Sequence, residues 1–315
     1  MAGEVQKLKQ LATQYESESW AEAGSCQPSH PLLKSVIASL TYSIGVIRDQ
    51  EAKFITRAYP TLMTQLYFEF CGGLSEVRDN QGRFAFGGTG NQTNTIIHKR
   101  TYLKQGLGSW FDIYQLPSKL AKRPIKNLKV DLYPDAIYRL FNISPQELAR
   151  EDLQLSDLFG VTNSSLMLEE MEAAETGKEL VNILERNFLN HILRLKGNRK
   201  QVRLSGPQAP GLDDDLRTLS QFHGKSERWL QKYYSKVYGM SFKKMQGNLR
   251  FYQAHRELTR AAVERKPMNL TELAYRFDYF DQAHFIREFK RYTGMTPGKY
   301  ARARLDAETQ SLFYW

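Results

Sequence analysis

One short pattern occurs twice in the last hundred residues, and this duplication constrains the fold more than any other feature. Residues 216–239 and residues 270–294 each contain a short segment of helical periodicity, a turn, and a longer segment of helical periodicity. Gly224 lies at the first turn and Asp278 at the second. Glycine adopts left-handed backbone angles without steric cost, and aspartate tolerates them better than most residues. The pattern therefore predicts two helix–turn–helix units.

The residues around the two turns also predict where the helices begin. Ser226 and Asp281 are side chains that commonly cap helix N-termini, and each directly precedes the longer segment of its unit. A third helix, of some 25 residues from about Ser241 to Arg265, is expected between the units. At 1.5 Å per residue this rod would be about 37 Å long.

Polar residues cluster in the first turns of the longer helix of each unit, at spacings that keep them on one broad face. The apolar residues four apart, Leu230 with Tyr234 and Phe285 with Phe289, fall on the opposite side and are expected to be buried. The polar face comprises Glu227, Arg228, Gln231 and Lys232 in the first unit and Gln282, Ala283, His284, Arg287 and Arg291 in the second. Glu227 is better explained as a helix-start charge favoured by the helix dipole.

The positive charge of the chain is concentrated in the same region. Of the net charge of +10, residues 1–206 contribute +3 (25 Lys and Arg, 22 Asp and Glu) and residues 207–304 contribute +9 (19 against 10), while residues 305–315 contribute −2. A concentrated basic field attracts polyanions. The charge alone would equally suit RNA, an acidic protein or an anionic membrane surface.

The segment from Leu273 to Tyr300 resembles the signature of the AraC/XylS family of transcription regulators, and the resemblance extends over residues 212–304. Leu249-Arg250, Ala254 and Leu258 resemble the family's linker helix. There are departures: Asp278-Tyr279 replaces the usual Gly-Phe, Ala283 a common Ser, and Lys232 and Tyr234 a usual Arg and Phe.

The resemblance implies a sequence-specific DNA-binding regulator, with two recognition helices in successive major grooves. It implies base contacts from residues of both units. Arg291 continues the same face one turn along, and this position predicts a contact with phosphate. The implied base contacts are Arg228, Gln231 and Lys232 in the first unit and Gln282, Ala283, His284 and Arg287 in the second.

The preceding part of the chain is predicted to be a mixed domain. Short β-like runs at Leu62–Phe70, Arg83–Phe86 and Thr95–Leu103 are followed by helical patterning from Tyr133, with a helix start at Ser144-Pro145. Residues 165–195 are expected to be helical with a break near Gly177, and Leu180, Ile183, Leu184, Phe188 and His191 to share a face. This region resembles, more loosely, the sensor domains that precede DNA-binding domains of this family, which combine a cupin-like barrel with helices.

The fold class expected is thus α+β: a mixed β-barrel or sandwich with helices, then an all-α double helix–turn–helix domain. A stretch rich in Gly, Pro and polar residues sets the boundary between the two parts. The divisions are an extension (1–29), a sensor or dimerisation domain (30–195), a linker (196–211), the DNA-binding domain (212–304) and a tail (305–315).

Enzymatic chemistry has little support in the sequence. The six histidines are scattered, with no His-x-His or His-x-x-x-His pair to hold a metal, and Cys26 and Cys71 are too few for a cysteine zinc site. The stretch Gly87–Gly90 lacks the Lys-Ser/Thr of a phosphate loop. No catalytic residue, metal or cofactor is therefore expected. A DNA-directed enzyme and a non-specific architectural protein remain as alternatives to the regulator.

Several partners are expected besides double-stranded DNA. A regulator of this kind is an activator or a repressor, which the sequence does not distinguish. RNA polymerase, a small-molecule effector and a second copy of the chain are candidate partners. Aromatic residues of the front domain could line an effector pocket, although they are more often core; they are Tyr59, Tyr67, Phe68, Phe70, Phe84, Phe86, Tyr102, Trp110, Phe111 and Tyr114. With no apolar run of about 18 residues and no signal peptide, a cytoplasmic protein without a membrane partner is expected.

Overall fold

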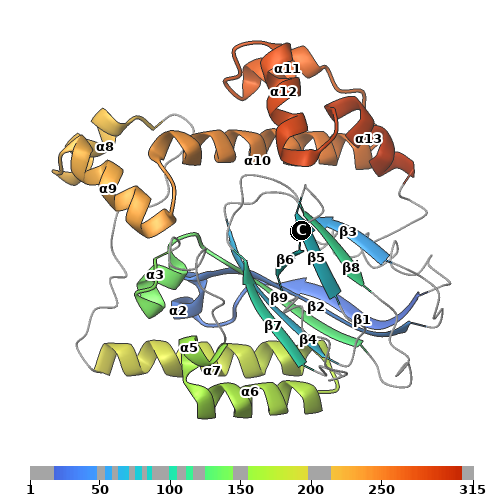
Figure 1. Ribbon diagram of the computed structural model, residues 1–315, viewed down its shortest axis with the longest axis vertical. Helices are drawn as coiled ribbons and strands as arrows, with labels where there is room; N and C mark the ends of the chain where they lie inside the picture. The colour runs from blue at the N-terminus through green and yellow to red at the C-terminus, as the bar shows by residue number, and fades with distance from the viewer. Residues whose placement is uncertain are drawn as a thin grey trace.

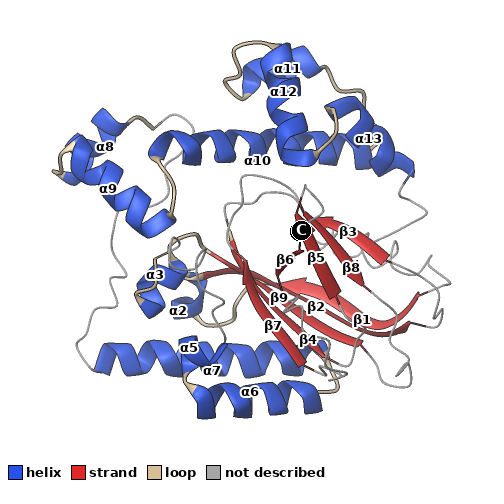
Figure 2. Cartoon of the chain, in the orientation of Figure 1, coloured by secondary structure: helices blue, strands red, loops and turns tan. Residues whose placement is uncertain are grey.

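The computed structural model of the chain describes the residues 18–47, 54–58, 63–70, 75–79, 84–86, 99–104, 111–115, 125–144, 155–197 and 214–306. Strands and a few helices make up the first part, and helices alone make up residues 214–306 (Figure 2). The mixed α+β class with a helical C-terminal part is confirmed. The helix start at Pro145, residues 198–211 of the expected linker and Cys71 lie outside the described residues, and residues 196–197 of that linker are helical.

The strands form two antiparallel sheets. The five-stranded sheet has the order β1-β2-β9-β4-β7 and the four-stranded sheet the order β3-β8-β5-β6. The first comprises β1 (Glu18–Cys26), β2 (Ile37–Ile47), β9 (Ile125–Leu132), β4 (Thr64–Phe70) and β7 (Lys99–Lys104); the second comprises β3 (Phe54–Ala58), β8 (Phe111–Gln115), β5 (Ser75–Asp79) and β6 (Phe84–Phe86). The described strands thus form two open sheets and no closed barrel, and β1 lies within the segment expected to be an extension.

Helices cover one side of the five-stranded sheet. Figure 1 shows α5, α6 and α7 on one side of this sheet and the four-stranded sheet on the other. The helices of this part are α2 (Pro31–Lys34), α3 (Ala136–Phe141), α5 (Leu155–Phe159), α6 (Val161–Ala173) and α7 (Gly177–Gly197). Alternate strand residues such as Phe68 and Val130 meet Leu184 and Phe188 of α7 in one core. The expected apolar face of 180–191 is confirmed, because Leu180, Leu184 and Phe188 are buried and His191 is half-buried against the carbonyl of Leu140.

Gly177 begins α7 rather than simply interrupting a helix. A Cβ atom at this position would lie 1.9 Å from Cδ2 of the Tyr42 ring, so only glycine allows β2 and α7 to approach this closely. Gly24 on β1 also faces Tyr42, where a Cβ would lie 2.6 Å from the hydroxyl oxygen. Two glycines therefore make room for one aromatic ring.

The other face of the five-stranded sheet is polar although it is buried. Asp131 on β9 accepts hydrogen bonds from Ser39 Oγ of β2 (2.9 Å) and from Gln65 Nε2 of β4 (2.7 Å). Lys129 Nζ lies 3.1 Å from Asp131 Oδ2, and Tyr67 donates to Gln65 Oε1 at 3.0 Å. Burial and the neighbouring Asp131 raise the pKa of Tyr67 above its usual range. Of the aromatic set expected from the sequence, Tyr67 faces this polar layer, while Phe68 and Phe70 belong to the helix-covered core. The side chains of the other members of the set lie outside the described residues.

The C-terminal part is built on one long helix, α10 (Phe242–Val263), which joins two smaller groups of helices (Figure 1). The first group contains α8 (Leu216–His223) and α9 (Glu227–Tyr238). The second contains α11 (Leu270–Arg276), α12 (Gln282–Thr293) and α13 (Pro297–Asp306). Each group has its own apolar cluster.

Candidate nucleic-acid interface

The two predicted helix–turn–helix units are present, and their turns have the expected backbone. Gly224, between α8 and α9, has φ of 59°, and Asp278, between α11 and α12, has φ of 53°. Both residues occupy the left-handed region that the sequence pattern called for. The carbonyl of Asp278 accepts a hydrogen bond from Arg250 Nη1 of α10 at 3.0 Å. A side chain of the connecting helix therefore helps to hold the non-glycine turn.

The longer helices of the two units begin and end alike. Ser226 accepts a hydrogen bond from the backbone N–H of Trp229 at 3.2 Å, and Asp281 accepts one from that of His284 at 2.6 Å. Gly239 and Gly294 end the helices with φ of 71° and 78°. Both helices contain 12 residues. The predicted N-caps are confirmed, and the two units present helices of equal length.

Packing buries one face of each longer helix and leaves the opposite face to solvent. Leu230 and Tyr234 of α9 are fully buried, as are Phe285 and Phe289 of α12. Burial raises the pKa of Tyr234 to about 12, with a further contribution from Asp214. The candidate contact residues that are exposed are Arg228, Gln231, Lys232, Ala283, Arg287 and Arg291.

Two of the candidate residues are engaged by the protein itself. Gln282 Oε1 accepts a hydrogen bond from Thr271 Oγ1 of α11 at 3.0 Å. His284 Nδ1 accepts one from the backbone N–H of Phe280 at 3.4 Å, and its Nε2 lies 3.6 Å from Glu288 Oε2. Its ring also packs edge-on against Tyr279. The structure thus gives His284 a role in holding the start of α12.

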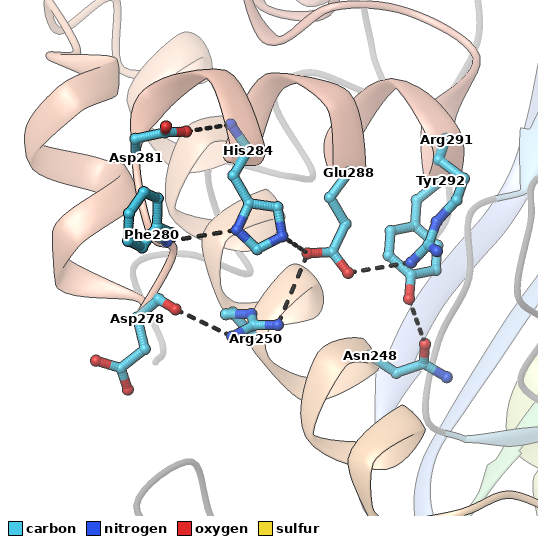
Figure 3. Close-up of polar contacts among 9 residues, drawn as sticks. All are labelled: Asn248, Arg250, Asp278, Phe280, Asp281, His284, Glu288, Arg291 and Tyr292. Carbon is cyan, nitrogen blue, oxygen red and sulfur yellow. Dashed lines mark hydrogen bonds and ion pairs between the residues drawn. The ribbon is translucent and has the colours of Figure 1, made fainter.

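Glu288 lies at the centre of this arrangement (Figure 3). Its side chain is only 10% exposed and faces three basic side chains: His284, Arg291 at 3.1 Å, and Arg250 of α10 at 3.8 Å. The Arg250 guanidinium also stacks on Tyr279, 4.9 Å from the ring centroid. Burial and the Glu288 carboxylate raise the pKa of Tyr279. Sequence reasoning missed Glu288 and the role of Arg250, because their spacing along the chain gives no sign that α10 and α12 meet here.

The connecting helix sets the separation of the two units. The predicted helix over 241–265 is confirmed as α10, with Ser241 as its N-cap and 22 residues. At 1.5 Å per residue it is about 33 Å long, close to the ~34 Å helical repeat of B-DNA. Asn248 of α10 accepts a hydrogen bond from Tyr292 of α12 at 2.8 Å, which fixes the second unit on the rod.

The chemistry of other site classes is not found in the described residues. Across the described ranges, no group of three or more His, Cys, Asp or Glu side chains is placed to hold a metal ion. Among the helices that the structure describes, none is long and apolar enough to span a bilayer. Cys26 is half-buried, and burial with the nearby Glu185 carboxylate raises the pKa of its thiol, which disfavours a reactive thiolate.

A comparison with protein-family models points to the same part of the chain. Residues 219–303 match a family model described as a helix-turn-helix domain. The chain is similar to ToxT from Vibrio cholerae O395, at 10% sequence identity and a TM-score of 0.36, over 86% of this chain and 99% of that chain. It is also similar to the C-terminal domain of AraT, a response regulator from Geobacillus stearothermophilus, at 25% identity and a TM-score of 0.26, over 32% of this chain and 78% of that chain. A comparison with curated proteins found no match.

The family match covers α9 to α12 in full, α8 from residue 219 onwards and α13 up to residue 303, which are the elements of the two units described above. The signature between Leu273 and Tyr300 falls on α11, α12 and the start of α13. Residues 219–303 are therefore a helix-turn-helix domain of the AraC/XylS type.

Proposed function

We propose that this chain is a transcription regulator that binds double-stranded DNA in a sequence-specific manner, with α9 and α12 in successive major grooves. The observation that carries the proposal is the pairing of two capped 12-residue helices, each with an exposed polar face, on a rod of about 33 Å. Recognition helices place their N-terminal residues on base edges. Arg228 and Gln231 of α9 and Arg287 of α12 are exposed where such contacts would form.

Charge supports the same proposal. Residues 207–304 carry a net charge of +9, which gives affinity for the phosphate backbone whatever the sequence. The exposed Lys225, Lys232 and Lys243 lie on or next to the first unit, and Lys290 and Arg291 lie on α12. An architectural protein would bind through this attraction to phosphate alone, whereas a regulator adds contacts to the bases.

The test is fluorescence anisotropy with the full-length protein over a salt series. One probe is a duplex enriched from a randomised pool by repeated binding to the protein, and the other is a scrambled duplex of the same composition. We expect a preference for the enriched duplex that persists at about 150 mM salt. Failure to enrich any sequence, or equal binding to both duplexes, would favour the architectural alternative.

We further infer that the N-terminal domain binds a small polar effector. The support is the buried polar layer around Asp131, because a buried ion pair contributes little to stability and an apolar layer would pack at lower cost. Ser39, Gln65, Tyr67 and Lys129 form this layer with Asp131 and come from three adjacent strands. In the same assay, pools of small polar metabolites should shift the affinity for DNA, and Asp131→Asn should reduce that shift.

We also propose that two copies pair through this domain. The exposed apolar side chains of Leu166 on α6 and Leu193 on α7 support a contact between protomers, and two-fold dimers are the commonest soluble oligomers. Sedimentation velocity should show a dimer, and Leu193→Glu should shift it towards monomer.

A further inference from the structure

The turn before α12 contains one residue more than the turn before α9. In the first unit, only Lys225 separates the left-handed Gly224 from the N-cap Ser226. In the second unit, Tyr279 and Phe280 separate the left-handed Asp278 from the N-cap Asp281. The additional residue places a phenylalanine at the start of the second recognition helix.

The Phe280 side chain does not pack on α12 in the way that is usual for the residue before an N-cap. An apolar residue directly before an N-cap commonly packs on the fourth residue of the helix, which here is Phe285. Tyr279 takes that place instead, with its ring centroid 5.0 Å from that of Phe285 and its side chain buried. The Phe280 side chain is left 85% exposed.

The backbone of Phe280 is nevertheless held in place. Its N–H donates to His284 Nδ1 at 3.4 Å, and His284 Nε2 lies 3.6 Å from Glu288 Oε2 (Figure 3). The His284 ring also packs against Tyr279. Phe280 precedes Ala283 by three residues and Arg287 by seven, and both of these are exposed. Ala283 and Arg287 are four residues apart and share one face of α12, and Phe280 directly precedes the N-cap of this helix. The exposed ring therefore lies at the N-terminal end of the helix whose solvent-exposed side presents a methyl group and a guanidinium.

We propose that Phe280 contacts the C5-methyl groups of thymines in the major groove. This inference rests on the proposed function, in which the N-terminal end of α12 lies against base edges. The thymine methyl is the apolar group of the major-groove edge, and phenylalanine and alanine side chains are suited to contact it. The second unit then selects thymine at the bases next to Phe280 and Ala283, while the first unit, with Arg228 and Gln231, selects by polar contacts.

The test replaces thymines with deoxyuridines, one at a time, in the duplex enriched by the full-length protein. This change removes a single methyl group and leaves the base pairing intact. Wild-type protein should lose about fourfold in affinity at one or two thymines, the loss that corresponds to one buried methyl group. Phe280→Ala should bind the unmodified duplex several-fold more weakly and should no longer distinguish thymine from deoxyuridine there. Phe280→Leu should keep the distinction.

Val263→Ala is the matched control, because Val263 is also an exposed apolar residue (61%) but lies at the end of α10. It should bind like wild type and keep the thymine preference. The inference is overturned if Phe280→Ala retains the same response to deoxyuridine, or if its loss is equal on the scrambled duplex. It is also overturned if Phe280→Ala binds every duplex normally but no longer regulates transcription. That result would indicate that Phe280 contacts a protein partner instead of DNA. Failure to enrich any duplex would contradict the proposed function itself.

Discussion

At the scale of single residues, the structure separates candidates that the sequence treated alike. His284 and Arg287 lie on adjacent turns of α12, and both were expected to contact bases. The His284 ring is engaged by Phe280 and Glu288, whereas the Arg287 side chain is exposed. A side chain that already has partners must give them up to contact a base, which reduces its net contribution to binding. Arg287 is therefore the stronger candidate for base recognition in the second unit.

Arg287→Ala should weaken binding to the enriched duplex by about 1–3 kcal/mol if the guanidinium contacts a base edge. Binding to a scrambled duplex should change much less. Arg256→Ala is the control, because Arg256 is an exposed arginine of α10 and its removal takes away the same charge. Anisotropy titrations with both duplexes measure the difference. Equal losses of affinity for the two duplexes would indicate that Arg287 contacts phosphate rather than a base.

At the scale of elements, close approach between helix and sheet depends on glycine. The N-terminal end of α7 lies on β2 with Gly177 directly against the Tyr42 ring. The backbone N–H of Gly177 also donates to Glu22 of β1 at 2.9 Å, so the helix start is tied to the sheet edge. Alanine is normally the better residue in a helix, by about 1 kcal/mol. Here the ring occupies the space that the alanine methyl would need.

Gly177→Ala should destabilise the protein by about 1–3 kcal/mol, the usual cost of overpacking a filled site. Gly298→Ala in α13 is the control, because no atom lies within 4 Å of the added methyl and its φ is not positive. That variant should be neutral or slightly stabilising. Urea unfolding followed by circular dichroism compares the two. If Gly177→Ala were as stable as Gly298→Ala, the Tyr42 ring would have to move aside without cost.

At the scale of the whole molecule, the two parts of the chain meet through α3 and α9. Tyr138 of α3 packs against the apolar cluster of the first unit, and Lys236 Nζ of α9 lies 5.5 Å from the centre of its ring. Burial first, and then the Asp135 carboxylate, raise the pKa of Tyr238 on α9. The apolar cluster of the second unit, in contrast, consists of residues from α10 onwards. The N-terminal domain is therefore packed against the first helix–turn–helix unit.

Tyr138→Ala should loosen the first unit and leave the second unchanged. Loss of a partly buried aromatic ring costs about 1–2 kcal/mol, which corresponds to roughly a 5–30-fold change in local opening. Hydrogen–deuterium exchange should accordingly be faster at the amides of α9 and unchanged at those of α12. Tyr133→Ala, at an exposed position just before α3, serves as the control. Equal protection of α9 in both variants would show that the contact contributes no stability.

Local rules were sufficient for the helix–turn–helix units. The left-handed turns at Gly224 and Asp278, the N-caps at Ser226 and Asp281 and the buried faces of α9 and α12 each depend on residues within one or two helical turns. Backbone angle preference and side-chain capping act over that range. The sequence therefore determined the class of the domain and which face of α9 and of α12 is buried.

Only the tertiary structure decided how these elements meet. The Arg250–Glu288 pair, the polar sheet face around Asp131 and the α3–α9 contact join residues far apart in the chain. Alternation along a strand predicts two faces, but it does not tell which face meets the helices or that both are buried. The exposure of Phe280 accompanies the burial of Tyr279, whose ring packs beside Phe285 and stacks with the Arg250 guanidinium of α10.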